Sequence, residues 1–165
     1  MIYVKDLMEV CNGKLLCGDI NLPLNNFSKD TRLINKDDVY IGIKGESFDG
    51  NKFYKDALDK GASVCILDNI DEVDDKYKDK TIVKVEDTIK AIGLLAKYKR
   101  SLYNIPVIAV TGSVGKTSTK DIIASVVSQK YKTLKTEGNN NNNIGLPLTI
   151  LKLKDHEALV VEMGM

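Results

Sequence analysis

The sequence predicts an α/β protein in which a small mixed α/β domain precedes the start of a P-loop-type parallel sheet. Two observations support this class. Short apolar segments of strand length alternate with segments of helical period along the chain. A glycine-containing loop, residues 111–115, also follows one apolar strand and leads directly into a helix, which is how nucleotide-binding sheets begin.

The composition is that of a soluble globular protein and argues against two classes of partner. With 24 basic and 23 acidic side chains, neither nucleic acid nor an anionic membrane is expected to bind. The charged segment 97–100 could form a nucleic-acid patch, but a solvated helix end is the favoured interpretation. No apolar run is long enough to cross a membrane and the N-terminus has no signal-peptide core, so we expect a cytoplasmic protein without membrane insertion. No feature predicts an obligate protein partner.

The cysteine and histidine content argues against several catalytic classes. Cys11, Cys17 and Cys65 form no CxxC pair, and Cys65 lies in an apolar run, so we expect structural residues. His156 is the single histidine of the sequence. Multi-histidine metal sites and His-dependent triads are therefore poorly supported.

The first hundred residues contain the elements of the small domain. A short helix is expected at 3–10, before a turn at Asn12–Gly13. A second helix is expected at 52–60, where Gly61 ends it. Four apolar segments of strand length are expected to form a sheet: 27–32, 39–43, 63–67 and 81–85.

A longer helix is expected to connect this domain to the next. Asp87 is suited to cap its N-terminus, and it should end near Tyr103 because Pro106 disfavours helix in the residue before it. We therefore divide the chain into domains 1–103 and 104–165. The apolar side chains of this helix recur at helical spacing: Ile89, Ile92, Leu95, Ala96 and Leu102.

The second domain is expected to alternate strands and helices. Its first helix should turn four apolar side chains toward the sheet. These are Ile122, Ile123, Val126 and Val127. The expected elements are strand 107–110, helix 117–129, strand 131–135, helix 147–152 and strand 158–162.

The loop after the first strand of this domain has the composition of a phosphate-binding loop. Gly112 and Gly115 let backbone N–H groups turn around phosphate oxygens, and the helix N-terminus adds positive charge. Lys116 is the predicted catalytic cation for the β and γ phosphates, and Thr117 is placed for Mg²⁺. The general pattern would place glycine at Val110, and a chance turn is the alternative. The predicted ATP-binding residues are Gly112, Ser113, Val114, Gly115, Lys116, Thr117 and Ser118.

Glu162 is the second predicted Mg²⁺ ligand. It ends the apolar run 158–162. An acid at the carboxyl end of a parallel strand can lie beside the phosphate loop and hold the ion directly or through water. An exposed acid at a strand end is the alternative interpretation.

Three segments of the second domain together resemble the Mur ligases, which build the peptide of bacterial cell-wall precursors. Residues 111–117 read TGSVGKT, similar to the family's TG[ST]xGK[ST], which requires no glycine at position 110. Residues 138–151 read GNNNNNIGLPLTIL, similar to GNxNNxIGxPLTLL. Residues 160–165 read VVEMGM, similar to VVExGx.

The first domain resembles the substrate domain of the later-acting Mur ligases. SKDTR at 28–32 is similar to SxDSR, and 39–53 is similar to LFVALKGxxxDGHxF, with Asn51 in place of histidine and Thr31 in place of serine. Arg32 suits a pyrophosphate, and a surface ion pair with an aspartate is the alternative. The resemblance implies that the UDP-linked precursor binds to Ser28, Asp30, Thr31, Arg32, Lys44, Gly45, Phe48, Asp49 and Gly50.

Residues 139–143 are five asparagines with two interpretations. They could form a flexible low-complexity loop. Their amides could also fix a peptide substrate and the metal-bound phosphate. The resemblance favours the second interpretation and matches Asn139, Asn141 and Asn142 to the family's substrate-binding pattern.

The resemblance implies ATP and Mg²⁺ as cofactors and an acyl-phosphate mechanism. IGLP at 144–147 resembles the member that adds a dipeptide rather than the member that adds the third residue. The implied substrates are UDP-N-acetylmuramoyl-tripeptide and D-alanyl-D-alanine. Since the family has three domains and this sequence stops inside the second, the chain alone is expected to be inactive.

Three alternatives stay open on sequence alone. The first is another ligase of the superfamily, either the third-residue Mur ligase or a folylpolyglutamate-synthase-like enzyme, distinguished by the amine it accepts. The second is a non-catalytic nucleotide-binding module, which would bind ATP without turnover. The third is a small P-loop kinase or GTPase, which the separate front domain and the lack of an NKxD segment disfavour.

Overall fold

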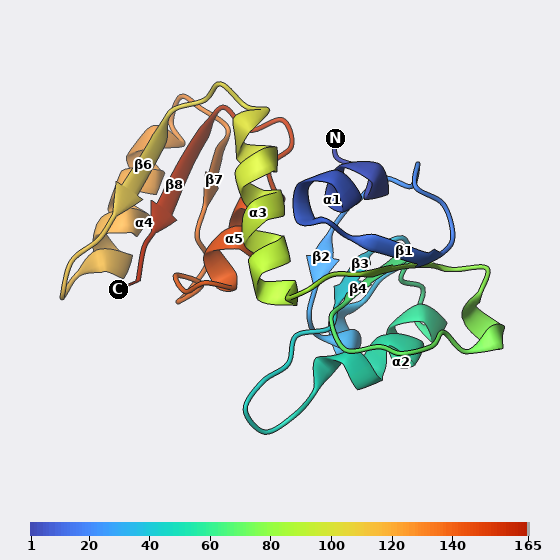
Figure 1. Ribbon diagram of the computed structural model, residues 1–165. Helices are drawn as coiled ribbons and strands as arrows, with labels where there is room; N and C mark the ends of the chain where they lie inside the picture. The colour runs from blue at the N-terminus through green and yellow to red at the C-terminus, as the bar shows by residue number, and fades with distance from the viewer. Residues whose placement is uncertain (165) are drawn as a thin grey trace. The chain divides into compact units, whose positions relative to one another are not determined.

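The structure, a computed structural model, describes residues 1–164 and divides into two compact units, Met1–Leu95 and the segment from Ala96 onward. Each unit has its own sheet with helices packed on it (Figure 1). The division falls inside helix α3 (Thr88–Ser101). Most strand pairs are parallel, and the predicted α/β class is confirmed. Within the described residues, none of the helices combines the length and the apolar character that crossing a membrane requires.

The first unit is built on a five-stranded sheet in the order β1-β5-β4-β3-β2. β2 to β5 run parallel, and β1 pairs antiparallel with β5. The carboxyl ends of the parallel strands therefore meet at one edge, where α/β sheets bind their ligands. The strands are β1 (Lys14–Cys17), β2 (Phe27–Ser28), β3 (Val39–Ile41), β4 (Val64–Leu67) and β5 (Thr81–Lys84).

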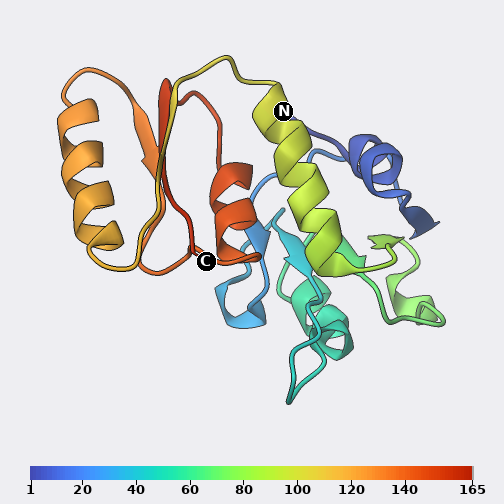
Figure 2. The same ribbon diagram turned by 60° about the vertical axis from the view of Figure 1, so that its left-hand side comes forward.

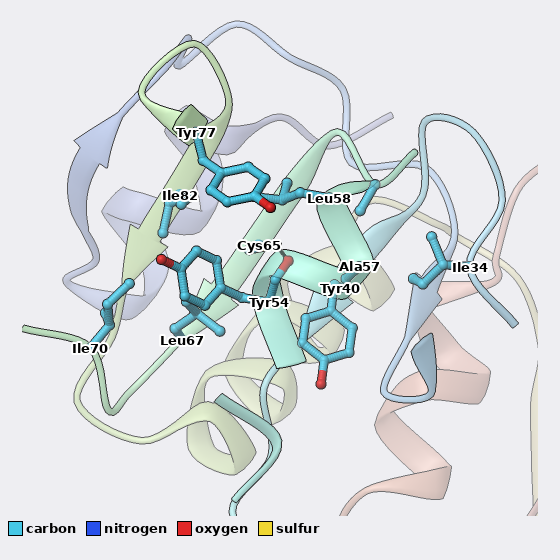
Figure 3. Close-up of a cluster of buried hydrophobic side chains, with 11 residues drawn as sticks. Ile34, Tyr40, Tyr54, Ala57, Leu58, Cys65, Leu67, Ile70, Tyr77 and Ile82 are labelled. Carbon is cyan, nitrogen blue, oxygen red and sulfur yellow. Dashed lines mark hydrogen bonds between the residues drawn. The ribbon is translucent and has the colours of Figure 1, made fainter. Parts of the chain in front are cut away.

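Helix α2 (Tyr54–Asp59) covers one face of this sheet through a buried apolar cluster (Figure 3). Side chains alternate between the two faces of a strand, so every second residue of the strands joins the cluster. The sheet contributes Tyr40, Cys65, Leu67 and Ile82, and α2 contributes Tyr54, Ala57 and Leu58. Burial raises the pKa of the Cys65 thiol well above its usual range, in keeping with a core cysteine.

The opposite face of the sheet is buried as well. Val64, Ile66 and Val83 point to that side and have no exposed surface. Helix α1 (Val4–Cys11) is tied to the start of α3, because the Cys11 thiol donates a hydrogen bond to the Ala91 carbonyl at 3.4 Å. The sheet is therefore a fully covered layer, and its open edge is left for binding.

The second unit contains a parallel three-stranded sheet in the order β6-β8-β7. Its strands are β6 (Val107–Val110), β7 (Thr133–Lys135) and β8 (Ala158–Glu162). Helices α4 (Lys116–Val127) and α5 (Gly145–Leu151) lie on opposite faces (Figure 2). The central strand β8 is buried along its whole length, so its terminal acid Glu162 is held by a strand that pairs on both sides.

The structure differs from the sequence expectations in three places. The strand expected at 27–32 ends at Ser28, because the Asp30 carboxylate accepts a hydrogen bond from the Arg32 backbone N–H and starts the 3₁₀ helix η1 (Thr31–Leu33). Strand β1 was not expected, since its four residues show no alternation and gain strand structure by pairing with β5.

The third difference concerns the face of α4 that was expected to pack on the sheet. Two of its side chains, Ile122 and Val126, are 66% and 67% exposed. The side that is buried carries Lys120 and Ala124 instead. Thr117 faces β8 from the first turn of this helix, and residues spaced by three and four from it share its face. The contact with β8 thus sets the rotation of the helix and leaves two apolar side chains outside.

A buried lysine at the end of α3 predicts a pH-dependent stability. Lys99 is 4% exposed, and its ammonium donates a hydrogen bond of 2.7 Å to the carbonyl of Leu151, the last residue of α5. Burial, helped by the charge of Lys154, lowers the pKa of Lys99 to about 8. The unfolded chain therefore binds more protons than the folded chain between pH 8 and about 10.4.

The expected result is a free energy of unfolding that rises with pH across that window. The cost of burying the cation is fully present below pH 8 and is relieved above it, by about 3 kcal/mol at most. Lys99→Met removes this titration and serves as the control. Urea unfolding of both chains at pH 7.5 and 10 measures the effect, and an equal pH dependence in the two would contradict it.

Candidate functional site

The first candidate site lies at the carboxyl ends of β6 and β8. These strands pair in parallel, and their register places Val110, the last residue of β6, opposite Glu162, the last residue of β8. The ladder continues for one more bond, because the Met163 N–H donates to the Val110 carbonyl at 2.9 Å. The loop that follows Val110 therefore starts directly beside the terminal acid of the neighbouring strand.

The loop turns back on itself and leads into α4. Gly115 precedes the first residue of α4 with φ of 75°, in the left-handed region that favours glycine. Free N–H groups at the start of a helix attract anions. A cavity of about 450 Å³ opens in front of them. Its lining residues are Ser113, Val114, Gly115, Lys116, Thr117, Ser118, Asn139, Asn141 and Glu162.

Lys116 lies across this loop. Its ammonium donates a hydrogen bond of 2.7 Å to the carbonyl of Gly112. The side chain is thus folded over the turn, with its charge at the mouth of the cavity. The seven predicted phosphate-binding residues span this loop and the first turn of α4. Six of them line the cavity, and Gly112 does not but accepts the hydrogen bond of Lys116.

Thr117 and Glu162, which are 45 residues apart in sequence, are in direct contact. The Thr117 hydroxyl donates to Oε2 of Glu162 at 2.9 Å, and Nδ2 of Asn141 donates to Oε1 at 2.7 Å. The Glu162 backbone N–H donates a hydrogen bond to the Thr136 hydroxyl oxygen at 3.1 Å. Glu162 is 2% exposed, so its carboxylate is held in one orientation at the cavity wall.

The charge state of Glu162 follows from competing influences. Burial alone raises the pKa of this carboxyl. The hydrogen bonds from Asn141 and Thr117, together with the charges of Lys120 and Lys116, outweigh burial and hold the pKa below its usual range. Glu162 is therefore an ionised carboxylate at neutral pH, in the lining of the cavity.

The donor set at this point fits Mg²⁺. The ion prefers oxygen ligands and keeps several waters, so one carboxylate and one hydroxyl beside bound phosphates are a usual protein contribution. Thr117 and Glu162 supply those two groups at the phosphate loop. Within residues 1–164 no three acidic, cysteine or histidine side chains gather at metal-binding distance. A cation bound here would therefore be coordinated by phosphate and water oxygens in addition to these two side chains.

The asparagine segment is tied to this site by specific contacts. Asn141 binds Glu162, as described, and its carbonyl accepts a hydrogen bond from Gly164 N–H at 2.8 Å. Oδ1 of Asn142 accepts from the N–H groups of Ile144 and Gly145 at the start of α5. A side chain at Gly145 would meet the Asn140 backbone at 2.6 Å. Asn139 and Asn141 thus both line the cavity, whereas Asn142 does not line it and binds the start of α5.

The second candidate site is a cavity of about 420 Å³ at the carboxyl edge of the first unit's sheet. It combines charged side chains with aromatic rings. Its lining residues are Lys29, Asp30, Thr31, Arg32, Tyr40, Phe48 and Phe53. Cations and exposed aromatic rings together suit a ligand that carries both phosphate and a planar base.

Arg32 and Asp30 form a bidentate ion pair at the rim of this cavity. Nε of Arg32 lies 2.9 Å from Oδ1 of Asp30, and the terminal nitrogen lies 2.6 Å from Oδ2. The hydrogen bonds from Arg32 lower the pKa of Asp30 to about 2. The ion pair with an aspartate, the alternative expected from sequence, is therefore present. The Arg32 side chain is nevertheless 84% exposed, which leaves its guanidinium accessible to an anion.

The five other residues predicted for this site do not line the cavity and make local contacts beside it: Ser28, Lys44, Gly45, Asp49 and Gly50. Ser28 accepts a hydrogen bond from Asp30 N–H at 3.1 Å and donates to the Asp30 carbonyl at 3.0 Å. The backbones of Lys44 and Asp49 form an isolated antiparallel β-bridge at the base of the loop between them. Gly45 and Gly50 make backbone hydrogen bonds within that loop. Sequence reasoning missed three lining residues: Lys29, Tyr40 and Phe53.

The positions of two of these missed residues in the sequence could have identified them. Lys29 lies between predicted residues, and Phe53 ends the segment 39–53 that carried the resemblance. Tyr40 is a strand residue with 1% exposure, and its hydroxyl donates to the Gly50 carbonyl at 2.8 Å. Because its neighbours in the sequence are apolar, the sequence did not distinguish Tyr40 from a core residue that lines no cavity.

Two models of protein families match the chain. Residues 25–100 match the Mur ligase family, catalytic domain, and residues 110–165 match the Mur ligase middle domain. The match over 110–165 includes Met165, the last residue of the VVEMGM segment, which lies outside the described residues.

Curated relatives match nearly the whole chain. The UDP-N-acetylmuramoyl-tripeptide–D-alanyl-D-alanine ligase of Synechocystis is 39% identical over 98% of this chain. The enzymes of the same name from Bacillus subtilis and Escherichia coli are 37% and 36% identical over 98% and 99% of the chain. The chain spans only 35% or 36% of the length of these relatives.

Solved structures agree with this similarity. MurF from Acinetobacter baumannii is 31% identical over 99% of this chain, with a TM-score of 0.87, and the chain covers 36% of it. MurF from Thermotoga maritima in complex with ADP is 36% identical over 84% of this chain, with a TM-score of 0.73 and 32% of that structure covered. On the family matches, the sequence relatives and the shared fold, the chain belongs to the Mur ligase family.

Proposed function

We propose that this chain is the front part of an ATP-dependent ligase that joins D-alanyl-D-alanine to UDP-N-acetylmuramoyl-tripeptide. In this proposal residues 1–103 bind the UDP-linked precursor, and residues 104–165 begin the ATP-binding domain. The observation that carries the proposal is the contact of Thr117 with Glu162 beside a lysine-bearing phosphate loop. Curated relatives with this activity support the choice of substrates.

The reaction requires the terminal carboxylate of the tripeptide to become a better electrophile. A carboxylate oxygen attacks the γ-phosphorus of ATP, and ADP leaves as the acyl phosphate forms. The amine of D-alanyl-D-alanine then attacks the acyl carbon, the bond to phosphate breaks, and the nitrogen loses a proton. The protein contributes positioning and charge neutralisation.

The residues of the phosphate loop take the roles that their geometry allows. Backbone N–H groups of 112–118 surround the phosphates, and Lys116 neutralises the charge that grows on the transferred group. Thr117 and Glu162 would hold Mg²⁺, which neutralises phosphate oxygens when bound. Asn141 keeps Glu162 in orientation through its 2.7 Å hydrogen bond, and Asn139 faces the same cavity.

The cavity of the first unit receives the UDP end of the precursor. Arg32 and Lys29 supply positive charge for the diphosphate, and Phe48 and Phe53 supply rings on which a planar base can stack. Since the precursor and ATP are both made inside the cell, we place the enzyme in the cytoplasm.

The test is phosphate release by the full-length protein given ATP, Mg²⁺ and UDP-N-acetylmuramoyl-tripeptide. We expect release that requires D-alanyl-D-alanine, and little release from the 165-residue chain alone. Release that requires instead a single amino acid and the UDP-linked dipeptide would move the protein to the preceding step of the pathway. Nucleotide binding without any turnover would refute the ligase.

One observation keeps the preceding step as the second candidate. The third-residue ligase of Clostridium tetani, which adds 2,6-diaminopimelate, is 34% identical over 76% of this chain. Its similarity covers less of the chain than that of the dipeptide-adding relatives. The identity of the accepted amine separates the two enzymes directly.

Replacing Arg32 with alanine tests the precursor cavity. We expect the KM for UDP-N-acetylmuramoyl-tripeptide to rise about tenfold or more, the size of a lost charge-assisted hydrogen bond. The KM for ATP should change less than about twofold. Lys55→Ala is the matched control, because Lys55 is also an exposed cation in an ion pair, at 2.7 Å from Asp74, outside the cavity. Equal KM values in the two variants would contradict the role of Arg32.

A further inference from the structure

A buried amide lies in the sequence between the cavity-lining residues Phe48 and Phe53 and makes hydrogen bonds to two parts of the first unit, Asp49 and residues 68–69. Asn51 is 2% exposed. Its Nδ2 donates to Oδ1 of Asp49 at 2.7 Å and to Oδ1 of Asp68 at 2.8 Å. Its Oδ1 accepts from the N–H groups of Asp68 at 3.0 Å and Asn69 at 3.3 Å. Its polar side-chain atoms are thus fully used inside the protein and make no direct contact with the cavity.

One side of this network holds the loop 44–50. Oδ1 of Asp49 also accepts from Asn51 N–H at 3.0 Å, and its Oδ2 accepts from Nδ2 of Asn69 at 2.8 Å. Gly45 N–H donates to the Phe48 carbonyl at 2.9 Å, which closes the loop. Every hydrogen bond of the Asp49 carboxylate therefore restrains the segment next to Phe48.

The other side of the network reaches the ends of two strands and the start of α3. Oδ2 of Asp68 accepts from the backbone N–H of Thr88 at 3.0 Å and from its hydroxyl at 2.9 Å. The Thr88 hydroxyl also lies 3.2 Å from the Gly42 carbonyl, to which it can donate. Thr88 is 1% exposed. The loop is thereby joined to residues that directly follow β3 and β4 and to the start of α3.

We infer that Asn51 is a positioning residue for the precursor cavity, acting through the two aromatic side chains on either side of it. Phe48 and Phe53 are 61% and 47% exposed, so few packing contacts hold them in place. Their backbone is restrained instead by the hydrogen bonds of Asn51 and by that of Tyr40 with Gly50. The inference rests on the proposed function for the identity of the ligand.

The physical reason is entropy. An exposed loop that must become ordered when a ligand binds lowers the affinity, because each ordered residue costs free energy. The network orders residues 44–53 before the ligand arrives. Burying Asn51 costs little because all its donors and acceptors are satisfied. Removal of the amide would deprive two carboxylates and two backbone N–H groups of the hydrogen bonds that they make with it.

Amide hydrogen exchange tests the restraint without any ligand. In the full-length protein carrying Asn51→Ala, we expect exchange across residues 44–50 to become at least about tenfold faster. Thr81→Val is the control, since Thr81 is also buried in this unit and accepts from Asp19 N–H at 3.0 Å, away from the cavity. Exchange in 44–50 that stays as slow as in the Thr81→Val protein would overturn the inference.

Calorimetric binding of UDP-N-acetylmuramoyl-tripeptide tests the consequence for the ligand. We expect Asn51→Ala to weaken binding about tenfold and to leave the Kd for ATP within about twofold. Combining it with Phe48→Ala should add little to the larger single effect, because both changes act on the same ring. Full additivity would show that Asn51 acts elsewhere and would overturn the inference.

Failure of the proposed function and failure of the positioning role of Asn51 would give different results. A wild-type protein that binds no precursor refutes the proposed function. A wild-type protein that binds it, with an Asn51→Ala variant that binds equally well, refutes the inference alone. If Asn51→Ala does not fold, Asn69→Ala takes its place: Asn69 is exposed, and the change removes one bond to Asp49. Faster exchange in 44–50 is then expected, and unchanged exchange overturns the inference.

Discussion

Replacing Lys116 with alanine is expected to lower the kcat of the full-length ligase by about a hundredfold or more. The ammonium of Lys116 is held over the phosphate loop by its 2.7 Å hydrogen bond to the Gly112 carbonyl. In the proposed reaction this ammonium is in place before ATP binds, and its charge would oppose the charge that grows during phosphoryl transfer. Alanine leaves the loop backbone intact and removes that charge.

The measurement is phosphate release under saturating precursor and D-alanyl-D-alanine, with the ATP concentration varied. Lys152→Ala is the matched control, because Lys152 is an exposed lysine of the same unit, paired with Glu137 at 3.1 Å and outside the cavity. A Lys116→Ala enzyme that keeps most of its ATP-dependent turnover would refute the assignment of this loop.

The second large effect is expected from Glu162→Gln. The change keeps the size of the side chain and removes its negative charge. We expect kcat to fall by about a hundredfold and the Mg²⁺ concentration for half-maximal rate to rise about tenfold or more. The KM for the UDP-linked precursor should stay within about twofold, since its cavity lies in the other unit.

Three further variants separate the charge of Glu162 from its structural contacts. Glu157→Gln changes an exposed glutamate, whose Oε2 accepts a hydrogen bond from Lys132 N–H, and should leave the Mg²⁺ dependence unchanged. Thr117→Ser keeps the hydroxyl that contacts Glu162, whereas Thr117→Ala removes it. We expect only the alanine variant to share the Mg²⁺ defect. A Mg²⁺ dependence equal to wild type in Glu162→Gln would exclude a metal role for this residue.

Local features of the sequence were sufficient for the class of fold and for most elements. Helix α3 and strands β4, β5, β6 and β8 lie within a residue or two of their expected positions. Each of these is a run whose hydrophobic period and ends are encoded by its own residues and near neighbours. The phosphate loop is of the same kind, because strand, glycine turn and helix follow one another without interruption.

Features that depend on partners far along the chain were not predictable in this way. The face of α4 that is buried, the existence of β1, and the lining of the precursor cavity by Tyr40 and Phe53 all result from pairing between distant segments. Asn51 is the clearest case. In the sequence it is a departure from a family pattern, and in the structure it is a fully hydrogen-bonded buried amide.

The sequence by itself therefore determined that this chain is an α/β protein in which a strand, a glycine-containing loop and a helix follow one another around residues 112–118, and its motifs indicated the family. Only the tertiary structure decided which side chains surround each cavity. The register of β6 on β8 brings Thr117 to Glu162 across 45 residues, and the network of Asn51 fixes the loop around Phe48. A sequence encodes turns and periods locally, but such contacts depend on strand register and helix rotation, which follow from packing of the whole unit.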